Sequence, residues 1–237
     1  ARQSSIVGVV AIGMTFVIIT AGIDLSVGSI FALSAFASVA AFFIFHQPVA
    51  VAFLAALATG GIFGAANGYL IGYMRLRAFL TTLVTLVIGR AIYDILVVNY
   101  GSVIQTSTAS SDLWDFIGDG DIHGVSVPVA AALVLAIFFH IALTRSRPGW
   151  HILAVGGSRR SAHNSGIRVR QTVFMSYVIS GLCSGLAGFL IGCRLSGAGP
   201  GTGLNLEILA ITAAVVGGNS LGGGRGSIAK ALMGAII

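Results

Sequence analysis

The feature that most constrains this chain is a long stretch without any formally charged residue between Asp24 and Arg75. Within residues 25–74, His46 is the only side chain of a type that titrates near neutral pH. A membrane-spanning helix needs about 20 consecutive apolar residues, so this stretch is long enough for two spans. Only 8% of the whole chain is charged, against about a quarter in soluble domains. The sequence therefore indicates a polytopic membrane protein built from α-helices.

Apolar segments of membrane-spanning length recur along the rest of the chain. They cover residues 5–22, 26–45, 49–72, 78–98, 127–144, 172–193 and 206–237, and a glycine-rich stretch at 217–226 interrupts the last one. We therefore expect an all-α transmembrane bundle with discontinuous helices and a single transmembrane domain over residues 1–237. Because the chain begins without methionine and stops inside an apolar run, we expect it to be part of a longer polypeptide.

Two polar loops differ in the sign of their charge, which predicts the orientation in the membrane. Residues 99–126 contain four aspartates and no Lys or Arg, whereas residues 145–171 contain six arginines and no acid. Positively charged loops stay in the cytoplasm, so the second loop is expected inside and the first outside. Arg75 and Arg77 then also fall inside. Topology thus explains the net charge of +6, and no nucleic-acid partner is expected.

Glycines spaced about one helical turn apart lie along two of the expected spans. They are Gly60, Gly64, Gly68 and Gly72 in the first, and Gly181, Gly185, Gly188 and Gly192 in the second. Small residues let helices approach closely in lipid, so helix packing is their expected role. Residues 68–72 (GYLIG) also resemble residues 188–192 (GFLIG), in a span of opposite direction. Inverted repeats of this kind are typical of transporters.

The segment 21–29 (AGIDLSVGS) places a carboxylate between two wholly apolar segments. A charge near the hydrocarbon costs several kcal/mol unless it is paired or hydrated. Gly22 and Gly28 favour a break in the helix, and Asp24 and Ser26 can cap the helix that follows. Two roles stay open for Asp24: a helix cap at the membrane surface, or the corner of a re-entrant element that lines a solute pathway.

Other polar residues interrupt the later spans. Arg90 and Asp94 lie one helical turn apart, so each can offset the desolvation of the other. Asn67 lies within the third span, and Glu207 begins the last one. Structural pairing of Arg90 and interhelical hydrogen bonding of Asn67 are the competing explanations. The candidate residues of a translocation pathway are Asp24, Ser26, Asn67, Arg90 and Glu207.

The sequence contains no recognisable catalytic set, metal site or nucleotide-binding motif. The five histidines do not fall at metal-ligand spacings, and no Ser or Cys has the context of a nucleophile. The stretch 222–227 (GGGRGS) lacks the spacing of a P-loop. We therefore expect no enzymatic activity and no cofactor bound by this chain. If ATP drives its function, another chain must hydrolyse it.

Three stretches together resemble the membrane permeases of ribose/xylose/galactose-type ABC importers, within the branched-chain amino acid/sugar permease superfamily. They are residues 13–18 (GMTFVI) with 22–29 (GIDLSVGS), residues 144–149 (TRSRPG) with 154–157 (AVGG) and 165–167 (SGI), and residues 206–207 (LE) with 213–228 (AAVVGGNSLGGGRGSI). The resemblance covers nearly the whole chain. Relative to that pattern, a first transmembrane helix and the last helices are missing, and Asp94 replaces a usually apolar residue.

The resemblance implies a multi-pass protein of the bacterial inner membrane that imports a monosaccharide, either a pentose or a hexose. Its partners would be a cytoplasmic ABC ATPase that holds ATP and Mg, a periplasmic sugar-binding protein, and a second permease in a homodimer or heterodimer. The ATPase-coupling element maps onto the basic loop, where a short helix is expected at 158–164. Its residues would be Arg147, Gly149, Gly156, Gly157, Ser165 and Gly166, and a bulky side chain at Gly157 or Gly166 should uncouple ATP hydrolysis from uptake.

Alternative functions share much of this pattern. A secondary transporter driven by an ion gradient also has broken helices and intramembrane charges. An ABC permease for a small solute other than a sugar would have the same architecture. A structural or receptor subunit of the membrane would show no solute flux. The sequence does not specify the sugar, because specificity resides largely in the binding protein.

Overall fold

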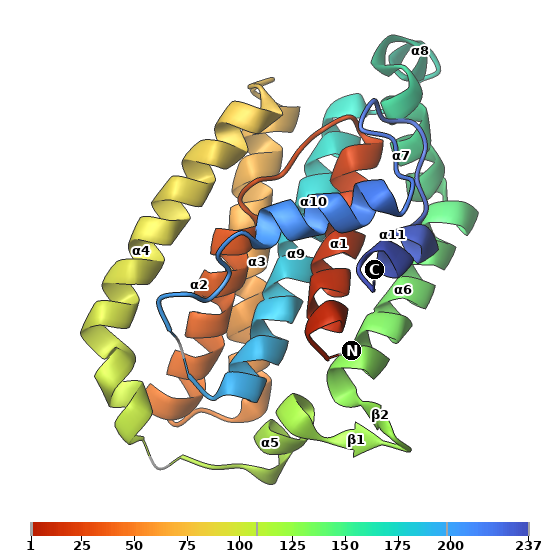
Figure 1. The fold of residues 1–237 in the computed structure, drawn as a ribbon. Helices are drawn as coiled ribbons and strands as arrows, with labels where there is room; N and C mark the ends of the chain where they lie inside the picture. The colour runs from red at the N-terminus through yellow and green to blue at the C-terminus, as the bar shows by residue number, and fades with distance from the viewer. Residues whose placement is uncertain (1, 108, 198, 237) are drawn as a thin grey trace.

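Six long apolar helices dominate the computed structural model, which describes residues 2–107, 109–197 and 199–236 (Figure 1). They are α1 (Arg2–Ile19), α2 (Val27–Val39) continued by the π-helical η1 (Ala40–Ile44), α3 (Val49–Gly72), α4 (Ala78–Thr106), α6 (Val127–Arg145) and α9 (Val169–Leu195). Each is long and apolar enough to cross a membrane. The prediction of an all-α polytopic bundle is confirmed.

The prediction that residues 206–237 form a membrane span is wrong. Two short helices replace it, α10 (Leu206–Val216) and α11 (Ile228–Gly234). Their 11 and 7 residues reach only about 16 and 10 Å, against roughly 30 Å of hydrocarbon core. Gly218, Gly223 and Gly224 adopt positive φ between them, which separates the two helices by a turn. Figure 1 shows α10 crossing in front of α1 instead of running alongside it.

Short elements also occupy the polar connections. The fourth span continues to Thr106, beyond its expected end at 98, and is followed by α5 (Asp112–Asp119). The antiparallel strands β1 (Asp121–Ile122) and β2 (Val125–Ser126) then lead into α6. The basic loop forms α7 (Arg147–Gly157) and α8 (Arg159–Asn164), so the short helix expected at 158–164 is confirmed.

Helices α1, α2 and α9 form the interior of the bundle. Their spans are 78%, 83% and 61% buried, whereas those of α3, α4 and α6 are 28%, 22% and 22% buried. Apolar side chains such as Leu54, Val87 and Ile137 are exposed on these outer helices. Such faces are suited to lipid or to another membrane subunit, because neither requires a polar surface.

Glycines bring α3 and α9 into backbone contact in an antiparallel arrangement. A Cβ built at Gly60 would overlap the carbonyl oxygen of Gly181. The other glycines of the two stripes also face a neighbouring helix: Gly64 faces Tyr177, Gly68 faces Phe174, Gly72 faces Arg170, Gly185 faces Ala56, Gly188 faces Phe31 and Gly192 faces Ser38. Side chains at these crossings would hold the helices apart. The inverted repeat stays a prediction.

Alanine at Gly60 is expected to lower the free energy of unfolding by about 1–3 kcal/mol, because the added methyl group overpacks the crossing. Gly61 is the matched control on the same helix, since a Cβ there would lie 3.4 Å from the Leu182 side chain. Gly61→Ala should be neutral or stabilising, as alanine favours a helix over glycine by up to about 1 kcal/mol. Thermal unfolding of both variants in the same detergent measures the difference. Equal melting temperatures would contradict the packing role.

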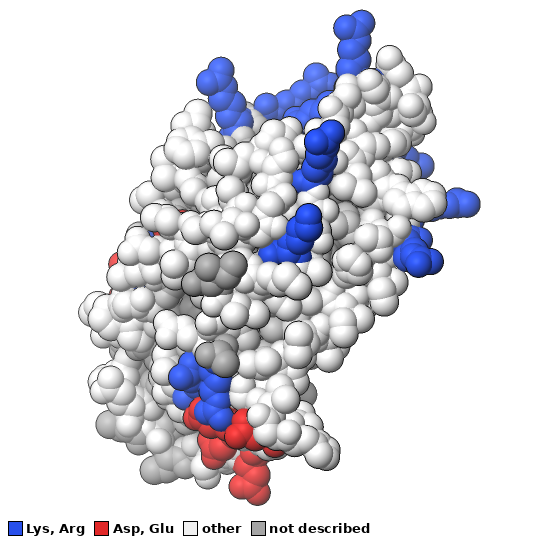
Figure 2. Space-filling model, turned by 45° about the vertical axis from the view of Figure 1, so that its right-hand side comes forward, with Lys and Arg blue, Asp and Glu red and all other residues white. Residues whose placement is uncertain are grey.

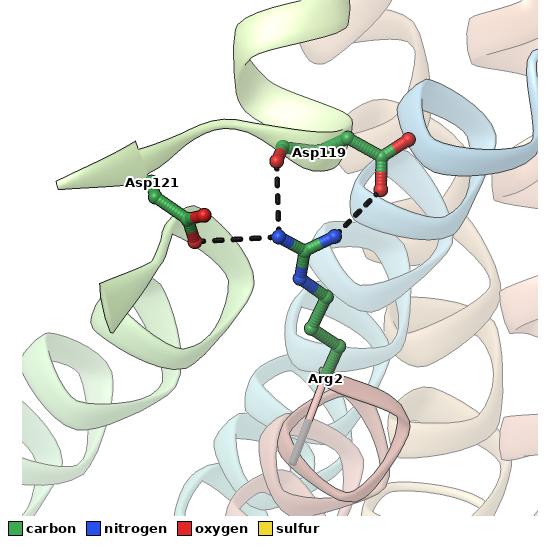
Figure 3. Close-up of polar contacts among 3 residues, drawn as sticks. All are labelled: Arg2, Asp119 and Asp121. Carbon is green, nitrogen blue, oxygen red and sulfur yellow. Dashed lines mark hydrogen bonds and ion pairs between the residues drawn. The ribbon is translucent and has the colours of Figure 1, made fainter. Parts of the chain in front are cut away.

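Charged side chains separate toward opposite ends of the bundle. On the face shown in Figure 2, most basic side chains lie toward the end that carries α7 and α8, and the acidic group lies at the other end. In that group, Arg2 pairs with Asp119 at 3.0 Å and with Asp121 at 3.3 Å (Figure 3). These ion pairs join the start of α1 to the end of α5 and to β1. The expected orientation, with 99–126 outside and 145–171 inside, depends on this separation of charge.

Candidate functional site

The chain breaks between α1 and α2, and the connection turns back into the bundle. Residues 20–26 link the two helices, with Ala21 in the left-handed region at φ 57°. Figure 1 shows this connection running back along the bundle, so that α2 begins below the ends of α1 and α3. A break of this kind frees backbone and side-chain polar groups, which must find partners inside the protein.

The Asp24 side chain accepts hydrogen bonds from polar groups of this connection and of α9. Its Oδ1 accepts hydrogen bonds from the backbone N–H of Ser26 at 3.0 Å and from the Ser26 hydroxyl at 2.5 Å. Its Oδ2 accepts a hydrogen bond from the Ser180 hydroxyl of α9 at 2.9 Å. All three residues are fully buried, and no Lys or Arg of the described residues forms an ion pair with this carboxylate. Hydrogen bonds are thus the observed compensation for its desolvation.

The same network continues into α3 and α4. The Asn67 side-chain amide donates to the Ser26 hydroxyl oxygen at 2.8 Å, and the Thr85 hydroxyl donates to the Asn67 carbonyl oxygen at 2.6 Å. The structure therefore brings three of the five pathway candidates, Asp24, Ser26 and Asn67, to one buried point. Ser180 and Thr85 could not be recognised from the sequence, because serine and threonine in a membrane helix commonly bond to their own backbone and have no distinctive pattern.

Arg90 lies outside this network and donates hydrogen bonds to the loop between α9 and α10. Its Nη1 donates to the Thr202 carbonyl at 2.8 Å, and its Nη2 donates to the Pro200 carbonyl. Its Nε lies 3.1 Å from Asp94 Oδ1, which is the expected i,i+4 pair. The neighbouring Tyr93 hydroxyl donates to the carbonyl of the same loop at Gly199, at 2.7 Å. This part of α4 therefore positions the backbone of the loop.

Glu207 lies where the start of α10 meets the start of α2. A Cβ built at Gly28 would overlap the Glu207 carboxylate and would lie 2.6 Å from the Gly203 carbonyl oxygen. The first turn of a helix favours a negative charge, because its N–H groups point outward there. Glu207 thus lies beside the first turn of α2, and Asp24 and Ser26 lie just before the same turn in the chain.

A cavity of about 730 Å³ lies beside the loop that Arg90 holds. Helices α1, α2, α4, α9 and α10 contribute to its walls. Its polar lining consists of Gln3, Gln105, Arg194, Ser196 and Thr202, and its apolar lining includes Phe31 and Leu206. None of the five pathway candidates lines it. These polar residues could not be recognised from the sequence, because they come from separate elements and form no motif.

At the opposite end, α7 ends against the break. A Cβ built at Gly156 would overlap the Ile19 carbonyl oxygen and would lie 2.5 Å from the Gly224 nitrogen. The Gly224 N–H also donates to the Ile19 carbonyl, at 2.9 Å. The end of α7, the end of α1 and the glycine-rich turn before α11 therefore meet through backbone atoms. We call this meeting of Gly156, Ile19 and Gly224 the backbone junction.

The six coupling candidates divide into two groups. Gly149 is buried at the corner between α6 and α7, where a Cβ would overlap the Leu143 carbonyl, and Gly156 belongs to the backbone junction. The other four lie on the exposed surface of α7, α8 and the turn that follows: Arg147, Gly157, Ser165 and Gly166. The first group faces the membrane-spanning helices, and the second is open to a partner.

The whole chain, residues 1–237, matches the model of the branched-chain amino acid transport system / permease component family. The chain belongs to this family. Ribose import permease protein RbsC of Escherichia coli K12 is 39% identical to it, over 100% of this chain and 73% of RbsC. Galactofuranose transporter permease protein YtfT of the same strain is 36% identical, over 100% and 68%. Xylose transport system permease protein XylH of Haemophilus influenzae is 31% identical, over 100% and 78%. No solved structure matches the chain with significance.

This family membership confirms the resemblance expected from the sequence motifs. With its six apolar helices, the permease is a multi-pass protein of the bacterial inner membrane. The family consists of permease components of transport systems, so the chain is a transport subunit. Over the described ranges, no cluster of three or more His, Cys, Asp or Glu could hold a metal ion.

Proposed function

We propose that this permease imports a monosaccharide, a pentose or a hexose, using ATP hydrolysed by a partner subunit. The observation that carries the proposal is the backbone junction, because it connects the exposed coupling surface to the break between α1 and α2. The sugar class is supported by the names of the relatives, which state ribose, galactofuranose and xylose.

The cavity beside the outer loop is our candidate for the solute entrance. Its volume of about 730 Å³ falls within the range of roughly 300–1,000 Å³ for small-molecule sites. The amides of Gln3 and Gln105 each offer donors and an acceptor, which suits the hydroxyl groups of a sugar. Arg194 is the one formally charged residue among the described residues that line it, as suits an uncharged solute.

In this proposal, the pathway candidates fix the positions of the segments that border the solute path. Asp24, Ser26 and Asn67 hold the break between α1 and α2. Arg90 holds the loop that borders the cavity, and Glu207 lies between α10 and α2. The five residues therefore position the segments around the path rather than contact the solute at the cavity.

The partners follow from the same arrangement. The exposed residues of α7 and α8 would contact a cytoplasmic ABC ATPase, which would carry the ATP and Mg. Closure of that ATPase would push α7. Because the atoms of the backbone junction are already in close contact, a displacement of α7 would also displace the end of α1 and the turn before α11. A second permease would cover part of the exposed apolar surface of the outer helices, and a periplasmic sugar-binding protein would deliver the solute to the outer cavity.

Reconstitution tests this function. The permease is placed in proteoliposomes with its ATPase and binding protein, and uptake of labelled ribose, xylose and galactose is measured. We expect uptake of at least one sugar that requires both partners and ATP, and that survives collapse of the ion gradients. Uptake that persists without the ATPase and follows an ion gradient would instead assign the chain to secondary transport. ATP-dependent uptake of amino acids but not of sugars would refute the sugar class alone.

A further inference from the structure

A second large cavity, of about 780 Å³, lies at the end of the bundle expected to face the cytoplasm. The last turn of α3 and the turn after it form one wall, and α8 with the start of α9 forms the other. Its apolar lining includes Ile71, Leu76, Ile167 and Val173, and its basic lining consists of Arg75, Arg159, Arg168, Arg170 and His163. We call it the basic cavity. It shares Gly166 with the coupling candidates, but most of its wall comes from other elements.

Within the described part of the chain, no acidic side chain pairs with the arginines of the basic cavity. Four arginines line it and no Asp or Glu does. Arg159 donates to the Thr20 carbonyl at 3.4 Å, and Arg168 donates to the Gln171 side chain at 3.5 Å. The ion pairs formed by arginines of the described residues involve Arg2 and Arg90 only. The orientation rule accounts for arginines on this side of the membrane, but not for their convergence on one cavity with an apolar wall.

We expect the cavity to open near the lipid headgroups, because aromatic side chains border it at the end of a membrane-spanning helix. Tyr73 lines it and stacks on Tyr69 with 5.6 Å between ring centroids, and Phe174 packs on Tyr73 at 5.9 Å. Both tyrosines are exposed at the end of α3. Tyrosine is enriched where membrane meets water, because its ring is apolar and its hydroxyl is polar. We therefore expect a membrane lipid to be able to reach this cavity from the bilayer.

We propose that the basic cavity binds the headgroup phosphate of an anionic phospholipid of the inner leaflet. Arginine is suited to phosphate, because its planar group donates two parallel hydrogen bonds to phosphate oxygens. Basic pockets between membrane helices on the cytoplasmic side bind anionic headgroups for this reason. An acyl chain would lie against Tyr73 and Leu76, the exposed apolar side chains of the lining. The lipid would join the end of α3 to α8 and thereby steady the surface next to the coupling segment.

Native mass spectrometry of the purified, delipidated permease tests this site. The protein is titrated with phosphatidylglycerol and, separately, with phosphatidylcholine of the same acyl chains. Wild type should prefer phosphatidylglycerol. The double variant Arg75→Ala/Arg170→Ala should lose about tenfold or more of that affinity, because each basic residue near the headgroup contributes appreciably. Arg145→Ala/Arg160→Ala removes the same charge outside the cavity and should change it by no more than about twofold. Arg75→Lys/Arg170→Lys, which keeps the charge, should retain most of the binding.

Several outcomes would overturn the proposal. Equal losses in the two alanine variants would show an effect of net charge alone, as would equal binding of the two lipids. Binding of inorganic phosphate that displaces the lipid completely and is lost in the same variant would assign the cavity to a free anion. Unchanged lipid binding by Arg75→Ala/Arg170→Ala, with lost ATPase association, would assign the arginines to the protein partner. Thermal unfolding of each variant shows whether the fold is intact, and transport activity is not needed for the readout.

Discussion

Replacing Gly156 with alanine is expected to reduce solute uptake at least about tenfold while the partner ATPase continues to hydrolyse ATP. The added methyl group would overlap the Ile19 carbonyl and would lie 2.5 Å from the Gly224 nitrogen. Overpacking of this kind costs about 1–3 kcal/mol, and 1.4 kcal/mol already corresponds to a tenfold change in rate. The cost falls on the contact through which α7 would move α1 and α11. Sugar uptake and ATP hydrolysis are measured in the same proteoliposomes.

Gly222→Ala is the matched control in the glycine-rich turn, because its Cβ would have Ser220 Oγ at 3.6 Å as its nearest neighbour. It should transport like wild type. Normal coupling in Gly156→Ala, with an unchanged melting temperature, would refute the role of the backbone junction. The expectation that bulky residues at Gly157 or Gly166 uncouple hydrolysis stays a prediction. A Cβ at either position has no neighbour within 4 Å, so a variant at Gly157 would act on the surface offered to the ATPase. A variant at Gly166 would also strain the backbone, because this glycine has a φ of 80°.

The second large effect is expected at Asp24, where alanine should lower the free energy of unfolding by about 3 kcal/mol or more. The carboxylate accepts three hydrogen bonds within the protein interior. Its removal leaves the Ser26 and Ser180 hydroxyls without this partner, and each buried unsatisfied group costs about 1–3 kcal/mol. Asp24→Asn should cost less, because the amide keeps one acceptor and the Ser180 hydroxyl can accept a hydrogen bond from its NH₂ group. Thermal unfolding in detergent ranks the two variants.

Asp112→Ala is the control for loss of an acid, since Asp112 is exposed at the start of α5. Its effect should stay within about 0.5–1 kcal/mol, the range of a charge at a helix terminus. If Asp24→Ala retains the melting temperature of wild type but loses uptake, then Asp24 acts on the solute path directly. That result would favour a direct role of Asp24 in the solute pathway over its proposed role in fixing the connection between α1 and α2.

Much of the fold could be predicted from local properties of the sequence. Apolar length placed the first six spans within a few residues of the observed helices, except at the end of α4. The last segment, from 206 onward, has enough apolar residues for a span but is divided by positive-φ glycines at Gly218, Gly223 and Gly224. Its apolar content was visible in the sequence, but the division into α10 and α11 depends on turns that pack against α7 and α1.

The candidate site was predictable only in part. A carboxylate between apolar segments marked Asp24, since an intramembrane charge is rare and costly. The partner of Asp24 on α9, Ser180, and the partner of Asn67 on α4, Thr85, could not be predicted, because both are ordinary residues of apolar helices until the fold makes them neighbours. Arg90 was predicted to pair with Asp94 and does so, but its bonds to the loop at Pro200 and Thr202 depend on where that loop lies.

By itself, the sequence determined that the chain enters a membrane, that its first six apolar segments are long enough to cross it, and to which permease family it belongs. These conclusions follow from apolar length, the sign of loop charges and short motifs, all of which are local. Only the tertiary structure decided that Gly156 meets Ile19 and Gly224, and that one hydrogen-bond network joins the connection at Asp24 to α3, α4 and α9. The physical reason is that hydrogen bonds and backbone contacts act over a few ångströms, so their partners are set by helix packing and not by sequence distance.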